Sequence, residues 1–141
     1  MTEIKLNVEK IIHAPIEKVF DAWLNPEILS KFMIPMPGMP EPDIENDARE
    51  GGSFKIIMYA GEDKLPHTGK YLEINRPNRL VFTWESHRSI DGSTVTIRFT
   101  KIDDEKTNIS LSQVKFIDEE ARSDHEVGWG NILDKLNVIM R

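Results

Sequence analysis

Hydrophobic and polar residues alternate along the first segment of the chain, from Ile4 to Ile12. Ile4, Leu6 and Val8 stand at every second position, with polar or charged residues between them. A period of two puts one set of side chains on one face of a strand. The pattern therefore predicts a half-buried β-strand at the start of the chain.

The spacing of apolar residues then becomes helical. Between Pro15 and Leu24 they recur every three or four positions, and proline suits a first helical turn. A second short helix is expected from Glu27 to Phe32. The segment from Met33 to Pro40 contains three methionines and three prolines, which is typical of an irregular apolar loop.

After Gly51-Gly52 the pattern becomes that of strands joined by short polar turns. The expected strands are Ser53 to Ala60, Leu65 to Ile74, Arg79 to Ser86, Ser93 to Ile102 and Thr107 to Phe116. The expected turns are Gly61-Glu62-Asp63, Arg76-Pro77-Asn78, Asp91-Gly92 and Asp103-Asp104-Glu105. Consecutive strands joined in this way form an antiparallel meander.

Helical periodicity returns from about Glu119 to the end of the chain. One stripe carries the apolar side chains Trp129, Ile132, Leu133, Leu136, Ile139 and Met140. The order of elements predicts an α+β fold, a curved antiparallel sheet of six or seven strands around a long C-terminal helix, with two short helices after the first strand. One helix is narrower than such a sheet, so the sheet must curl, and a curled sheet tends to leave a cavity.

Composition narrows the classes of function. The chain has 141 residues, which fits a single domain over 1–141. Its net charge of −6 is opposite in sign to that of a typical nucleic-acid binder, so no nucleic-acid partner is expected. Cysteine is absent, and neither an export signal nor a membrane-inserting segment is present in the sequence, so a cytoplasmic location is expected.

Several short motifs follow one another in a characteristic order. They are Ala14-Pro15 with Glu17, Val19-Phe20 and Ala22-Trp23; Asp47-x-Arg49-x-Gly51-Gly52-x-Phe54; Gly69-x-Tyr71-x-Glu73-Ile74; Pro77-x-Arg79-Leu80-Val81-Phe82-Thr83-Trp84; Thr94-Val95-Thr96-Ile97-x-Phe99; and Gly128-Trp129 with Leu133 and Leu136. Together they resemble the bacterial proteins similar to the C-terminal domain of the activator of the heat-shock chaperone ATPase. That family lies within the helix-grip superfamily of START domains and birch-pollen allergens (SRPBCC), and the resemblance covers essentially the whole chain.

The resemblance implies a helix-grip fold with an apolar pocket between the sheet and the last helix. It implies less about activity, because the superfamily contains lipid carriers, cyclases and many members without an assigned function. Two departures stand out. Relatives often carry a tryptophan pair where this chain has Lys31-Phe32-Met33. The chaperone activator also has a separate N-terminal chaperone-binding domain, for which 141 residues leave no room.

The apolar residues of the meander, the last helix and the Met/Pro loop are the candidate ligand-binding residues. They are Phe32, Met33, Met36, Phe54, Ile56, Met58, Tyr71, Phe82, Trp84, Ile97, Phe99, Leu111, Trp129, Leu133 and Leu136. We expect an enclosed pocket bordered by Phe82, Trp84, Phe99 and Trp129. The alternative is that the same residues form a packed core. Gly128 has no side chain, so we expect the helix backbone to approach the sheet or a ligand closely there.

A possible catalytic cluster consists of His67, Tyr71 and Glu73, because strand alternation puts all three on one face of a strand. An imidazole, a phenol and a carboxylate in an apolar pocket could orient a ligand or move a proton. The alternative is that His67 is solvated at a strand end and Glu73 pairs with Arg79 across the turn.

Metal and cofactor chemistry lacks support in the sequence. His13, His67, His87 and His125 show none of the spacings typical of metal sites, and no cofactor motif is present.

The leading hypothesis is binding of a small apolar or amphipathic molecule. The alternatives are a chaperone-assisting interaction module, and a cyclase or hydrolase acting through the His/Tyr/Glu cluster.

Overall fold

Seven strands and three helices make up the part of the chain that the computed structural model describes, residues 4–86 and 89–141. In chain order they are β1 (Lys5–Ile12), α1 (Ile16–Ala22), α2 (Pro26–Phe32), β2 (Asp43–Asn46), β3 (Ser53–Ala60), β4 (Asp63–Asn75), β5 (Arg79–Thr83), β6 (Ser89–Asp103), β7 (Lys106–Phe116) and α3 (Glu119–Met140). The predicted α+β architecture is confirmed.

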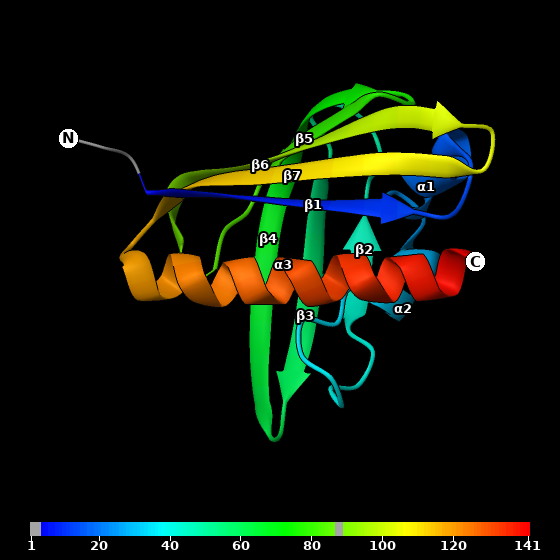
Figure 1. Cartoon of the computed structure of the whole chain (residues 1–141). Helices are drawn as coiled ribbons and strands as arrows, with labels where there is room; N and C mark the ends of the chain where they lie inside the picture. The colour runs from blue at the N-terminus through cyan, green and yellow to red at the C-terminus, as the bar shows by residue number, and fades with distance from the viewer. Residues whose placement is uncertain (1–3, 87–88) are drawn as a thin grey trace.

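All seven strands form one antiparallel sheet in the order β1-β7-β6-β5-β4-β3-β2. Figure 1 shows β1, β6 and β7 running along α3, whereas β3 and β4 run across it. The sheet therefore turns strongly around the helix, as expected for a wide twisted sheet covered by a single helix. This curvature defines the helix-grip fold and brings the β3–β4 hairpin to one side of α3.

The strand β2 has no counterpart among the predicted elements. It spans four residues at the edge of the sheet, pairs with β3 and alternates between exposed and half-buried positions. A strand of four residues is too short for a period of two to stand out from a polar sequence. Its addition brings the sheet to seven strands.

The turn expected at Asp91-Gly92 is wrong. The strand β6 runs through this position with an irregularity between Ser89 and Thr94, and β5 ends at Thr83 rather than at Ser86. Gly92 has a positive φ of 86°, and Lys115 on β7 also has a positive φ, of 69°. A positive φ at glycine is compatible with a bulge as well as with a turn, so the residue type alone could not distinguish the two.

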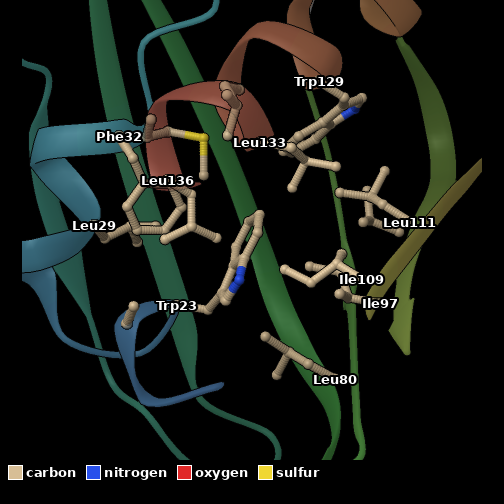
Figure 2. Packing of buried hydrophobic residues seen from close by; sticks show 14 of the residues in the cluster. Trp23, Leu29, Phe32, Leu80, Ile97, Ile109, Leu111, Trp129, Leu133 and Leu136 are labelled. Carbon is tan, nitrogen blue, oxygen red and sulfur yellow. The ribbon is translucent and has the colours of Figure 1, made fainter. Parts of the chain in front are cut away.

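A buried polar chain joins α3 to the sheet through the core. Trp129 is 2% exposed, and its Nε1 donates a hydrogen bond of 2.7 Å to Oε1 of Gln113 on β7. Nε2 of Gln113 donates to Oγ of Ser93 at 3.0 Å, and this hydroxyl donates to the carbonyl oxygen of Val114 at 2.9 Å. Figure 2 shows the apolar side chains of α3 packed against those of α2 and the strands around Trp129. The buried side chains of Trp129, Gln113 and Ser93 are therefore linked by hydrogen bonds.

We expect the Gln113→Leu substitution to lower the free energy of unfolding by about 1–3 kcal/mol, because it leaves the buried indole N–H of Trp129 without an acceptor. Adding Trp129→Phe removes that donor, so the double variant should lose less than the sum of the two single losses by about 1 kcal/mol. Denaturant unfolding of the four proteins measures this difference. Additive losses would show that the hydrogen bond does not couple α3 to β7.

Candidate functional site

The space between α3 and the sheet is filled by aromatic rings. Phe82, Trp84, Phe99 and Trp129 are each at most 4% exposed, and the rings of Trp84 and Trp129 are 5.0 Å apart. Neither of the two spaces described below is bordered by all four of these residues, which belong to the buried hydrophobic cluster. Trp23 after α1 also lies beside Trp129, with ring centres 6.5 Å apart.

A small cavity remains next to this aromatic cluster. Its volume is about 20 Å³, room for about one water molecule. It is lined by Trp23, Leu29, Met33, Phe54, Ile56, Tyr71, Phe82 and Trp84. A space of this size cannot hold an organic ligand.

A larger, open groove of about 430 Å³ lies between α3, the β3–β4 hairpin and the loop after α2. Asp124, His125, Val127, Gly128, Trp129 and Ile132 of α3 line one wall. Met58, Leu65, His67 and Trp84 line the sheet side, and Pro35 and Met36 of the loop complete it. Most of these side chains are apolar, so the groove can accommodate an apolar body with a few polar contacts.

The loop that forms one end of the groove lies close to α3. Nδ2 of Asn131 donates a hydrogen bond of 2.8 Å to the carbonyl oxygen of Pro35. A Cβ atom added to Gly128 would lie 3.2 Å from Cβ of Pro35. Gly128 therefore permits a close approach to α3, and the neighbour is the loop rather than the sheet. Met36, which follows, is 58% exposed at the groove wall.

Two histidines belong to the groove, one on each wall. Nδ1 of His67 lies 3.0 Å from the carbonyl oxygen of Leu65, and Nδ1 of His125 lies 2.7 Å from that of Ala121. A carbonyl oxygen only accepts, so each of these hydrogen bonds requires a proton on Nδ1. In the neutral ring Nε2 is then the nitrogen with acceptor character. The ring of His67 also lies against Trp84, at 4.8 Å.

The proposed His67, Tyr71 and Glu73 cluster is not assembled on one face. A β-bulge lies between Tyr71 and Glu73, so that Tyr71 pairs with Phe82 but Glu73 pairs with Val81. Consecutive residues of β5 point to opposite faces of the sheet, and the bulge therefore turns Glu73 away from Tyr71. Glu73 instead lies 3.7 Å from Nε of Arg79, as the alternative interpretation held.

Tyr71 lies apart from the groove, in the wall of the small cavity. Its hydroxyl accepts a hydrogen bond of 3.1 Å from Nδ2 of Asn46, which also donates to the carbonyl oxygen of Leu24 at 2.9 Å. Burial raises the pKa of the Tyr71 phenol, and the hydrogen bond from Asn46 opposes part of this shift. Asn46 thereby joins β2 to Tyr71 on β4 and to the segment that follows α1.

The predicted ligand-binding residues divide among three places. The groove contains Met36, Met58, Trp84 and Trp129, and the small cavity contains Met33, Phe54, Ile56, Tyr71, Phe82 and again Trp84. Neither space is lined by Phe32, Ile97, Phe99, Leu111, Leu133 or Leu136, which are core residues. The ligand-binding set had omitted Asp124, His125, Val127 and Ile132. Asp124, His125 and Ile132 stand three or four residues from Gly128 or Trp129, which puts them on a neighbouring face of the helix, and this is a signal that the sequence contains.

The structure adds two negative findings for the described residues. Within 4–86 and 89–141, no three histidine, aspartate or glutamate side chains are grouped as a metal site would require. In the same ranges no helix has the length and apolar character needed to cross a membrane. His87 lies outside the described residues.

We expect the stability of the protein to fall as the pH rises above about 10, where the tyrosines of the unfolded chain ionise before the buried Tyr71 does. The sign follows from the raised pKa of Tyr71, since the folded state favours the neutral phenol. Unfolding by denaturant from about pH 9 to 11 measures the decline, and Tyr71→Phe should reduce it. Tyr59 also has a raised pKa, because its hydroxyl is hydrogen-bonded to the carboxylate of Asp43. This pair is exposed, so repeating the measurement at high salt reduces the charge interaction of Tyr59 with Asp43. An equal decline in the wild type and the variant would contradict the prediction.

Known structures share this fold along almost the whole chain. Protein CV1439 from Chromobacterium violaceum is 26% identical, with 97% of each chain covered and a TM-score of 0.86. The AHSA1-like protein from Aeromonas hydrophila is 24% identical over 96% of this chain and 90% of that one, with a TM-score of 0.78. PFC0360w, an HSP90 activator from Plasmodium falciparum, is 21% identical over 96% and 95%, with a TM-score of 0.76. The similarities to the Aeromonas and Plasmodium proteins show only that the fold is shared.

A search of curated proteins found no match. The family model described as Activator of Hsp90 ATPase homolog 1-like protein (AHSA1) matches residues 13–141. This match spans β2 to β7, all three helices and every residue of the groove. The chain therefore belongs to the AHSA1 family, in agreement with the resemblance of its motifs.

Proposed function

We propose that the protein binds a small apolar or amphipathic molecule in the groove between α3 and the β3–β4 hairpin. The observation that carries this proposal is the groove itself. Its volume of about 430 Å³ lies within the range of small-molecule sites, about 300–1,000 Å³. Most of its lining is apolar, and Met36 and Val127 expose 58% and 60% of their surface there.

The proposed position differs from the interior pocket that the sequence had favoured. Aromatic packing leaves only about 20 Å³ next to Trp84, so an organic ligand would lie in the open groove instead. The Met/Pro loop supports this position, because Met36 can adapt its flexible side chain to different apolar shapes. A cytoplasmic location is part of the same proposal.

Naphthylethanol is a suitable neutral probe, since it combines a flat apolar body with one hydroxyl. We expect it to bind in titration calorimetry and to lose affinity several-fold for Val127→Gln, because an amide replaces an apolar wall group. Val138→Gln is the matched control. Both valines lie on α3, with exposed fractions of 60% and 59%, but Val138 is outside the groove. Absence of probe binding, or equal losses in both variants, would refute the proposal.

A second candidate function is assistance of an Hsp90-type chaperone. It is favoured by the family description and by the fold shared with the Plasmodium HSP90 activator. The test is the ATPase rate of the chaperone with increasing amounts of this protein. We expect no saturable stimulation at physiological salt, where contacts made by exposed charges are weak. Saturable stimulation under those conditions would put chaperone assistance first.

A further inference from the structure

We infer that Met36 is a site of reversible oxidation by hydroperoxides, and that its sulfoxide weakens binding in the groove. The position of the site follows from the exposure of the methionines and needs no ligand. The effect on binding rests on the proposed function and adds a form of regulation to the same groove.

Methionine is the residue type through which this chain can be oxidised reversibly, because cysteine is absent. Five methionines lie in the described ranges, and they differ widely in exposure. Met33, Met58 and Met140 are 2%, 4% and 6% exposed, and Met39 is half-buried against the hydrophobic core. Met36 is 58% exposed. Among these five, a reagent dissolved in water therefore reaches the side chain of Met36 first.

The exposed methionine stands in the wall of the groove. It directly follows Pro35, whose carbonyl oxygen accepts the hydrogen bond from Nδ2 of Asn131 on α3. Its side chain lines the groove together with Val127 of the helix, which is 60% exposed. The position that an oxidant reaches most easily is therefore also one that a ligand in the groove would touch.

The oxidation needs no catalytic group. A lone pair of the sulfur attacks one oxygen of a hydroperoxide, an S–O bond forms and the O–O bond breaks. The sulfur loses two electrons, and the hydroperoxide is reduced to water or to an alcohol, with the proton passing to the leaving oxygen. Methionine sulfoxide reductases reverse the step, one enzyme for each sulfoxide epimer. A dithiol then supplies two electrons and two protons, and the oxygen leaves as water.

Oxidation replaces a flexible apolar side chain by a polar one with an acceptor oxygen. Water solvates this oxygen in the open groove, and the apolar body of a ligand has to displace that water without offering a donor. Binding of an apolar body is therefore weakened. Folding is affected little, because more than half of the Met36 surface is already exposed.

The test treats the folded protein with dilute hydrogen peroxide and follows each methionine by tandem mass spectrometry of its peptides. We expect Met36 to be converted before Met33, Met39, Met58 and Met140. Once Met36 is converted, the affinity for naphthylethanol in titration calorimetry should have fallen about three- to tenfold, because a polar group now stands in the apolar wall. The free energy of unfolding should be unchanged at that point.

Three variants separate Met36 from the rest of the chain. Met36→Leu keeps an apolar side chain without sulfur, so peroxide should leave its affinity for the probe unchanged. Met39→Leu is the matched control from the same loop, and it should lose affinity on treatment as the wild type does. Met36→Gln brings a polar side chain without oxidation and should bind the probe as weakly as the oxidised protein. Both reductases with a dithiol should restore binding to the oxidised wild type.

The outcomes separate the inference from the proposed function. Conversion of any other described methionine as fast as Met36 would show that the site is wrong. Unchanged affinity after conversion of Met36, or an equal loss in treated Met36→Leu, would overturn the regulation while binding in the groove stands. If the probe does not bind the untreated protein, the proposed function fails and the effect on binding falls with it. The order in which the methionines are converted then still decides whether Met36 is the site of oxidation.

Discussion

The contact of Trp129 with the sheet is the interaction on which the rest of the structure depends. Its ring packs against Trp84, and its N–H reaches Gln113 across the core, so α3 is held both by apolar contact and by a directed hydrogen bond. An aromatic pair contributes about 0.5–1.5 kcal/mol beyond its buried area. The hydrogen bond also restricts the rotation of α3 about its axis, because a turn of the helix would leave a buried donor unpaired.

This packing decides where a ligand can be bound. A curved sheet around a single helix leaves space, and in this chain aromatic side chains from β3, β5, α3 and the end of α1 fill it. Empty volume remains at the side, where the β3–β4 hairpin extends beyond the helix. The same buried tryptophans that fill the interior also line the open groove. The packed core and the groove therefore share residues, and a change at Trp84 or Trp129 alters both.

Much of the fold could be predicted from the sequence, whereas the site could be predicted only in part. Periods of two and of 3.6 residues and the turn residues between them indicated six of the strands and all three helices, because each of these elements buries apolar side chains. The four-residue β2 and the bulges in β4 and β6 gave no such signal. Apolar residues at Phe82 and Phe99 indicated the inner face, but the pattern does not tell whether rings meet or enclose a space. That depends on side-chain volumes and rotamers.

The bulge between Tyr71 and Glu73 has a consequence for comparing chains of this family. One extra residue, Leu72, exchanges the two faces of β4 for every position that follows. Deletion of Leu72 would restore strict alternation and bring the carboxylate of Glu73 to the inner face, where an unpaired charge is strongly disfavoured. An alignment gap at this point therefore has a structural meaning. In a relative that lacks this residue, the positions from Glu73 to Asn75 lie on the opposite faces of the strand. Residues aligned by sequence alone in this segment would then not occupy equivalent places in the two structures.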